Sequence, residues 1–268
     1  MSTPLIVFVT ALGWLALLGL CRWGAYRWFC DGPRAEPVSG LMWRCFRVYC
    51  RLMHRATYLG LQHVPDTNRP GGLIVVGNHT GPVDPMLIQA ACRFDIRWMM
   101  AADQMTPHLD WFWRRQRMIP VARDGTDTAP AREAIRHVRG GGVIGIFPEG
   151  GIVRPSGEIR PFYNGVGLII ARTNAPVLLV WTCGTPQATE LLPALRSRSH
   201  ARVQFIDRME FAGQRDAAQI TRQLRQRLTE ASGWPLSDQP VIPPQATTDP
   251  FAPSRRPLPP CASGTMST

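Results

Sequence analysis

The sequence predicts an α/β fold with a mostly parallel central sheet flanked by helices, preceded by an N-terminal membrane-anchoring helical segment. After residue 70, short apolar runs alternate with longer helical stretches, which is the pattern of a parallel sheet. Residues 4–21 carry no charge. The chain has 268 residues, of which 45% are hydrophobic and 18% charged, so it can bury a sizeable core and is neither wholly disordered nor fibrous.

Four segments follow from composition and pattern. Their bounds are 1–21 for a membrane anchor helix, 22–60 for basic amphipathic membrane-associated helices, 61–232 for the α/β domain, and 233–268 for a disordered tail. The tail holds nine prolines in 36 residues and few large apolar groups, which is typical of a segment without a packed core.

The first segment is long enough to meet a membrane, because 18 helical residues reach about 27 Å and a bilayer core is roughly 30 Å thick. A cleaved signal peptide is disfavoured because nothing basic precedes the apolar run. A lipoprotein signal ending at Cys21 is disfavoured by the large Leu20. We therefore expect an uncleaved anchor, which either spans the membrane or inserts deeply.

The charges on either side of this segment predict its orientation in the membrane. Arg22, Arg27 and Arg34 follow it, whereas no Lys or Arg precedes it. The positive-inside rule then places the α/β domain on the cytoplasmic face of a membrane, and a bacterial inner membrane fits best.

Residues 40–60 predict a basic amphipathic helix. Arg44, Arg47, Arg51 and Arg55 share one helical stripe among apolar and aromatic residues. This pattern favours a helix lying on anionic lipid. An ordinary helix that covers the protein core would show a similar pattern and remains the alternative.

The charge balance of the whole chain excludes several functions. All 30 basic side chains are Arg, with a net charge of +11, so a Schiff-base lysine and a Walker-type phosphate loop are both excluded. Guanidinium groups suit anionic partners. Nucleic acid is not expected, because the arginines are spread along the chain without a recognised binding motif. The seven cysteines show no zinc spacing, so no metal is expected either.

The α/β domain contains six short apolar runs and five helical stretches. The runs read as buried strands at 72–77, 97–101, 118–122, 142–147, 176–181 and 202–206. The helical stretches lie near 83–93, 108–116, 130–139, 164–174 and 214–231. Pro130 suits the first turn of the third helix, with Thr128 nearby as a cap.

Reactive residues in such a sheet collect on loops at the carboxyl ends of the strands. The loop after 72–77 contains His79 and Asp84, separated by four residues across a turn with Gly81 and Pro82. At this spacing the carboxylate can reach one imidazole nitrogen while the other faces substrate, which makes a general base. A structural histidine is the alternative.

Two further strands end in candidate binding residues. Glu149 and Gly150 follow 142–147, with Arg154 close behind, and can bind hydroxyls and an anion together; a solvated turn is the alternative. Arg123 lies directly after 118–122, where it is either a phosphate ligand or a surface residue. An aromatic group belongs either to the core, or to an acyl-chain tunnel or a membrane-facing rim: Trp98, Trp111, Phe112 and Trp113.

Together these segments resemble a known family. The blocks Asn78-His79-x-x-x-x-Asp84 (an HX4D motif), Ile119-Pro-Val-x-Arg123, Phe147-Pro-Glu-Gly150 and Ala175-Pro-Val177 match, in order, four blocks of the PlsC-like glycerolipid acyltransferases. The chain is similar to the 1-acylglycerol-3-phosphate acyltransferases of phospholipid biosynthesis over about residues 40–210.

The resemblance implies an activity and roles for single residues. Residues 61–232 would be an acyltransferase domain that uses acyl-CoA or acyl carrier protein as co-substrate, without other cofactors, and acylates lysophosphatidate to phosphatidic acid. His79 would be the base and Asp84 would orient it. Substrate binding would fall to Asn78, Arg123, Glu149, Gly150 and Arg154.

The third and fourth blocks depart from the family pattern, the fourth with Leu179 in place of its second proline. The third block usually continues Gly-Thr-Arg-Ser, but here Gly150 is followed by Gly-Ile-Val-Arg154, which displaces the arginine by two positions. The acceptor therefore stays open between lysophosphatidate and another lysolipid, such as a lysophospholipid or a lyso-aminolipid. A non-catalytic membrane lipid-binding protein is the alternative from another class.

Overall fold

The computed structural model describes residues 3–122 and 128–241. Its helices are α1 (Thr3–Cys30), α2 (Pro37–Met53), α3 (Asp84–Ala91), α4 (Asp110–Gln116), α5 (Ala129–Arg139), α6 (Gly165–Thr173), α7 (Leu191–Arg196) and α8 (Ala217–Ser232). Its strands are β1 (Thr57–Leu59), β2 (Leu73–Gly77), β3 (Ile96–Ala101), β4 (Ile119–Val121), β5 (Val143–Ile146), β6 (Val177–Cys183) and β7 (Arg202–Met209).

The seven strands form one sheet in the order β1-β7-β6-β2-β5-β3-β4. Neighbouring strands are parallel except β6 and β7, which pair antiparallel. The predicted α/β fold with a mostly parallel sheet is therefore confirmed. The short strand β1 and helix α7 were not predicted, because runs of three and six residues leave too little periodicity to recognise.

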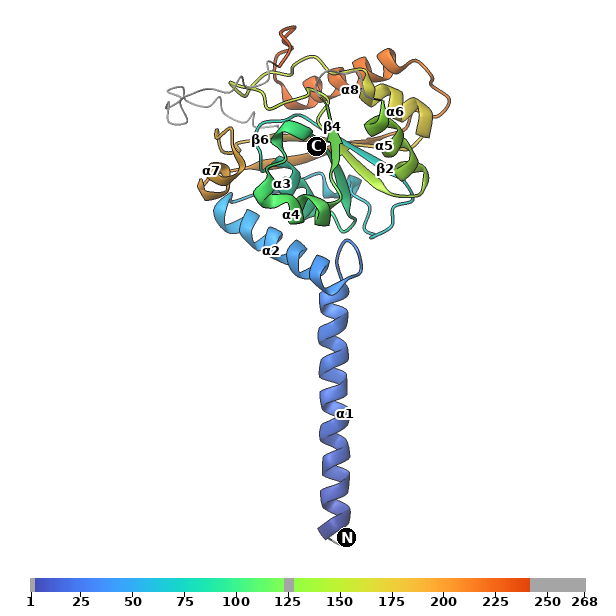
Figure 1. The fold of residues 1–268 in the computed structure, drawn as a ribbon, viewed down its shortest axis with the longest axis vertical. Helices are drawn as coiled ribbons and strands as arrows, with labels where there is room; N and C mark the ends of the chain where they lie inside the picture. Colours follow the sequence, from blue (N-terminus) through green and yellow to red (C-terminus); the bar gives the residue numbers. More distant parts are fainter. Residues whose placement is uncertain (1–2, 123–127, 242–268) are drawn as a thin grey trace, which may run out of the picture.

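Helices cover both faces of the sheet (Figure 1). On one face, α5, α6 and α8 pack on Ile74 and Val76 of β2. On the other, α2, α3 and α7 pack on Leu73 and Val75. Burial on both faces explains why β2 and β6 read as continuous apolar runs rather than as alternating ones.

Helix α2 uses one face to cover the domain. Its Trp43 indole nitrogen donates to the Gln89 carbonyl of α3 at 3.2 Å, and Cys50 is fully buried. The core-covering interpretation of residues 40–60 therefore holds for this face of the helix.

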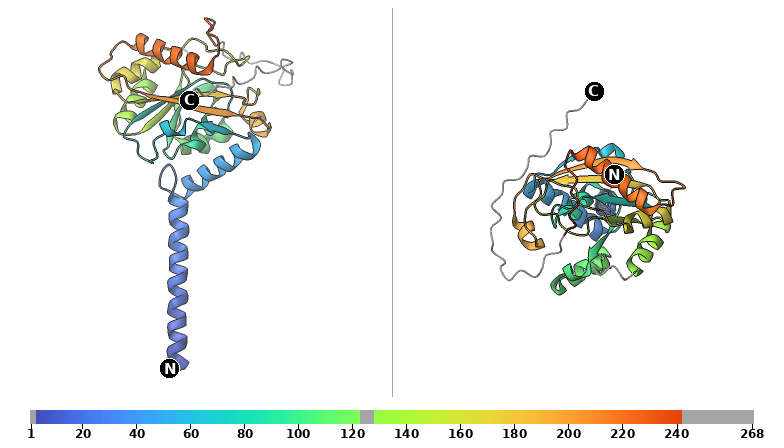
Figure 2. Two further views of the ribbon diagram at one scale, coloured as in Figure 1. Left: turned by 180° about the vertical axis from the view of Figure 1, so that it is seen from behind. Right: turned by 90° about the horizontal axis from the view of Figure 1, so that it is seen from above.

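Helix α1 projects from the body of the protein, as Figures 1 and 2 show. It continues without a break beyond the predicted bound at residue 21 and takes in Arg22 and Arg27. Among the described residues, no helix combines the length and the apolarity that crossing a bilayer requires. The membrane-spanning form of the anchor expected at 1–21 is thus not supported.

The predicted disordered tail begins too early. Trp234 is buried and meets Trp181 edge-to-face, with ring centroids 5.5 Å apart. Beyond it, Pro235 and Ser237 exchange backbone hydrogen bonds with Ile159 at 3.0 and 3.1 Å. Residues 233–241 therefore belong to the domain, because a single large aromatic side chain anchors them; the remaining tail, 242–268, lies outside the described residues.

Candidate active site

The candidate site lies where three neighbouring strands end. Strands β6, β2 and β5 are adjacent and parallel, so the loops that follow them meet at one edge of the sheet. The loop after β2 carries His79, the loop after β5 carries Glu149, and the loop after β6 carries Thr185. The third predicted loop, after β4, contains Arg123, which lies outside the described residues.

His79 and Asp84 form the predicted pair. The His79 Nδ1 atom lies 3.0 Å from Asp84 Oδ2. Asp84 is the first residue of α3 and is fully buried, and the same oxygen accepts the backbone N–H groups of Thr80 and Gly81 at 2.6 and 2.9 Å. A carboxylate accepts hydrogen bonds, so Nδ1 is the protonated ring nitrogen and Nε2 is left as the basic one.

Two aromatic rings fix the plane of the imidazole. Phe147 stacks on His79 with centroids 4.2 Å apart and an interplanar angle of 8°. Trp98 stacks on the far side of Phe147 at 4.8 Å and 9°. Trp98 is buried and lies over Gly145, where a side chain would collide with the indole. The sequence interpretation missed this stack, for which the only signal was the phenylalanine that precedes Pro148.

Glu149 reaches the backbone of the His79 loop. Its Oε2 accepts the backbone N–H of His79 at 2.8 Å, and its Oε1 accepts that of Arg160 at 3.1 Å. The side chain is buried, and burial raises its pKa to about 8, against the opposing effect of these two N–H donors. Both oxygens are thus engaged with the protein rather than directed to an acceptor.

The side-chain amide of Asn78 is likewise hydrogen-bonded within the protein. Its Nδ2 donates to the Thr182 carbonyl and its Oδ1 accepts the Thr182 N–H, both at 2.8 Å. This pair of hydrogen bonds continues the β2–β6 contact beyond the last residue of β2. Asn78 therefore holds the start of the loop after β2 against strand β6.

Arg154 also binds backbone carbonyls. One of its terminal nitrogens donates to the Thr80 and Val153 carbonyls, and the other donates to the Ala188 carbonyl at 2.9 Å. Burial lowers the pKa of this arginine. The guanidinium therefore joins the loops after β2 and β6, and its charge lies beside the His79–Asp84 pair.

Gly150 forms the turn after β5. Its φ of +76° lies in the left-handed region, and a side chain there would collide with Tyr163. Its backbone N–H donates to the Phe147 carbonyl at 3.1 Å, which closes the turn. This turn directs Glu149 back towards His79.

Three threonines that the sequence interpretation did not single out line the back of the site. Thr185 donates to Thr80 at 3.0 Å, and the Thr80 and Thr182 hydroxyls are 3.4 Å apart. All three are buried. In the described part of the chain, no group of three or more His, Cys, Asp or Glu side chains is arranged to hold a metal ion.

Comparison with known proteins identifies a matching family model and a similar fold. Residues 55–182 match the family model described as Acyltransferase. The fold is similar to that of the 1-acyl-sn-glycerophosphate (LPA) acyltransferase PlsC from Thermotoga maritima, with a TM-score of 0.58 and 17% sequence identity. The similarity covers 70% of this chain and 77% of that one.

Proposed function

We propose that this chain, whose residues 55–182 match the Acyltransferase family model, is a PlsC-like acyltransferase that transfers a fatty acyl group from acyl-CoA or acyl carrier protein to the free hydroxyl of 1-acylglycerol 3-phosphate, giving phosphatidic acid. The observation that carries the proposal is the His79–Asp84 pair, with Nδ1 bound to a buried carboxylate at 3.0 Å. It leaves one basic nitrogen at the edge of the sheet where the loops meet.

The reaction needs one proton transfer in each direction. His79 Nε2 takes the proton of the acceptor hydroxyl while its oxygen attacks the thioester carbonyl. The tetrahedral intermediate then expels the thiolate, which takes the same proton back from the imidazolium. Asp84 stabilises that imidazolium, and Phe147 holds the ring in the plane that both transfers require.

The remaining motif residues position this base. Glu149 holds the backbone of His79, and Arg154 holds the backbone of Thr80. Arg123 stays the proposed ligand of the acceptor phosphate, since Arg154 is bound to carbonyl groups.

The hydrogen bonds of Arg154 to backbone carbonyls favour a second candidate acceptor. With its guanidinium held by Thr80 and Ala188, Arg154 has little capacity left for a terminal phosphate monoester. A lysophospholipid or lyso-aminolipid acceptor, whose phosphate is esterified or missing, demands less positive charge. The mechanism at His79 is the same for either acceptor.

We propose that α1 and α2 bring the domain to a membrane, on its cytoplasmic face. Side chains of α1 are exposed and apolar, among them Phe8, Trp14 and Leu18 at 61%, 66% and 61% exposure. The outer face of α2 bears an exposed apolar stripe at helical spacing: Val38, Leu41, Cys45, Val48 and Leu52. Arginines flank this stripe, which suits anionic lipid.

The activity test uses the purified full chain with a panel of acceptors and both donor types. The acceptors are lysophosphatidate, glycerol 3-phosphate, lysophosphatidylglycerol and a lyso-aminolipid. His79→Ala is the inactive variant, and His108→Ala, at an exposed position outside the site, is the matched control. Transfer to lysophosphatidate that His79→Ala abolishes and His108→Ala retains supports the proposal. Preference for another acceptor selects the second candidate, and no transfer to any acceptor favours the non-catalytic alternative.

The membrane test is flotation of the full chain with vesicles, with and without phosphatidylglycerol. The variant Leu41→Asp/Val48→Asp places charge in the apolar stripe, and Leu192→Asp places it on an exposed leucine of α7. We expect only the first to weaken vesicle binding. Equal binding by all three proteins contradicts the role given to α2.

A further inference from the structure

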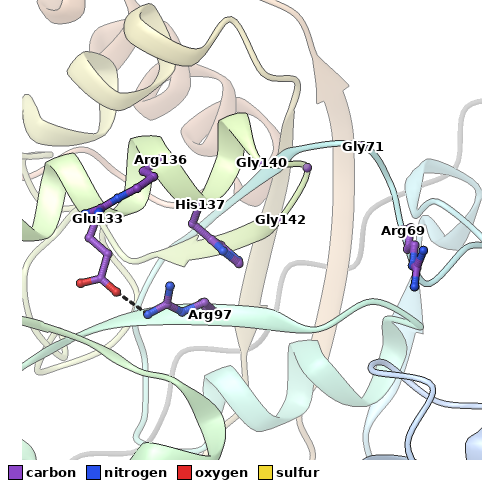
Figure 3. A pocket seen from close by; sticks show the side chains of 9 residues that line it. Arg69, Gly71, Arg97, Glu133, Arg136, His137, Gly140 and Gly142 are labelled. Atoms are coloured by element: carbon purple, nitrogen blue, oxygen red, sulfur yellow. Dashed lines mark hydrogen bonds and ion pairs between the residues drawn. The ribbon is translucent and has the colours of Figure 1, made fainter.

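A second basic site lies at the opposite edge of the sheet from His79. A cavity of about 950 Å³ opens beside the amino ends of β2, β5 and β3, between Gly71, Gly142 and Arg97 (Figure 3). Strand β2 has five residues and separates this cavity from the loop of His79 by roughly 17 Å. The cavity is therefore distinct from the candidate active site.

Three arginines from separate elements line this cavity, with Arg69 across the opening from Arg97 and Arg136 (Figure 3). Arg69 precedes β2, Arg97 lies on β3, and Arg136 lies on α5. The only acidic residue among those lining the cavity is Glu133, which pairs with Arg97 at 2.6 Å. The lining therefore keeps a net charge of +2 with histidine neutral.

Two of the guanidinium groups are available to a ligand. Within the described residues, the side chains of Arg69 and Arg136 make no ion pair or hydrogen bond, and both residues are exposed. Arg97 is instead held rigidly, because its Nε also donates to the Arg117 carbonyl at 2.7 Å. The site thus combines one fixed cation with two that can close on a ligand.

The rim of the cavity lacks side chains that would obstruct a ligand. Gly71 and Gly141 both have positive φ, and no atom lies within 4 Å of where a Cβ would be at either position. The amides of the loop at 140–142 are bound to carbonyls of α5, so recognition rests on the guanidinium groups. Basic residues at the C-terminus of α5 also complement its dipole, but that effect does not account for Arg69 and Arg97, which come from elsewhere.

We infer that this cavity is a binding site for a phosphate-bearing small molecule. Planar guanidinium groups bind phosphate through paired hydrogen bonds, which a cluster of lysines would not do. The cavity is open to solvent, and its volume exceeds that of phosphate alone and lies within the roughly 300–1,000 Å³ of small-molecule pockets. The same phosphate chemistry is present in soluble nucleotides and in lipid headgroups.

His137 reports on the same site. It lines the cavity, and burial lowers its pKa, with the charges of Arg97 and Arg117 acting in the same direction. A bound anion offsets those positive charges, so it raises the pKa of His137. This gives a readout that needs no turnover and is independent of the proposed function.

The test is calorimetric titration of the full chain with pyrophosphate and ADP as soluble probes, and with dihexanoyl phosphatidic acid as the headgroup probe. Arg69→Glu and Arg136→Glu reverse charges that face the cavity. Arg132→Glu is the matched control, one turn earlier on α5, exposed and outside the lining. Arg69→Gln and Arg136→Gln are measured beside them, and circular dichroism checks that each variant is folded.

We expect at least one probe to bind, and to bind about tenfold or more weakly after either reversal, with Arg132→Glu unchanged. Whether pyrophosphate and ADP or the phosphatidic acid binds more tightly identifies the source of the ligand. The His137 proton resonances should titrate at higher pH with the tightest probe bound. Affinity in the two reversal variants equal to that of the unsubstituted chain, an equal loss in Arg132→Glu, or no binding of any probe overturns the inference.

Discussion

The carboxylate of Glu149 accepts the backbone N–H of His79 at 2.8 Å, so a residue of one motif holds the main chain of another. Seventy positions separate the two residues in sequence. They meet because β2 and β5 are parallel neighbours and end at the same edge of the sheet. Glu149 therefore holds the base in position. Its own ionisation also changes the free energy of unfolding.

The pH dependence of stability tests this role. Burial raises the folded-state pKa of Glu149 to about 8, above the value of an unfolded glutamate, so folding favours its protonated form. The contribution to stability is full below about pH 4 and is lost as the pH rises through 8. We expect Glu149→Gln to flatten the decline in the free energy of unfolding between about pH 5 and pH 8, measured by urea denaturation. Parallel curves for the two proteins would contradict this assignment.

Substitutions of His79 and Asp84 should both abolish activity but should differ in their effect on stability. His79→Ala should abolish transfer while costing about 1 kcal/mol, because the ring is partly exposed and holds no backbone group in place. Asp84→Ala should abolish transfer and also destabilise by about 1–3 kcal/mol for each N–H group left unpaired at Thr80 and Gly81. Comparison of single-turnover rates and thermal unfolding for the two variants checks the difference. Equal stability losses would argue against the observed hydrogen bonds.

Phe147→Leu should lower kcat by about 2- to 10-fold. The stack on His79 contributes about 0.5–1.5 kcal/mol, and its loss lets the imidazole leave the reactive plane. Phe46→Leu, which removes a ring from the core below α2, is the control and should leave kcat unchanged. A change in acceptor KM with constant kcat would instead place Phe147 in acceptor binding.

The two motif arginines should have different kinetic effects. Arg154→Lys keeps the charge but loses the two terminal guanidinium nitrogens that bind the carbonyls of Thr80 and Ala188. We therefore expect kcat to fall about tenfold with acceptor KM unchanged. Arg123→Ala should mainly raise acceptor KM, from several-fold to about a hundredfold, through loss of charged hydrogen bonds. Initial rates over a range of acceptor concentrations distinguish them. The opposite pattern would make Arg154 the ligand of the acceptor.

Two truncations test the corrected bound of the tail. Ending the chain after residue 241 should preserve activity and thermal stability. Ending it after 233 removes Trp234 and the backbone pairing with Ile159, and should destabilise by about 3–5 kcal/mol from the tryptophan alone. It also frees the segment that carries Arg160, whose N–H binds Glu149, so activity should fall. Equal behaviour of the two truncated proteins would show that 234–241 is dispensable.

The sequence by itself determined the alternation of strands and helices, the candidate pair His79 and Asp84, and the resemblance to the PlsC-like acyltransferases. These features are local: burial on both faces makes strands continuously apolar, and a carboxylate five positions after a histidine at a helix start can reach its ring. The tertiary structure alone decided that Asn78, Glu149 and Arg154 hold backbone groups, and that Phe147 and Trp98 stack on the base. The same holds for the packing of Trp234 and for the placement of Arg69, Arg97 and Arg136 around one cavity. Each depends on which strands become neighbours, and strand order arises from packing of the whole sheet, which no short stretch of sequence encodes.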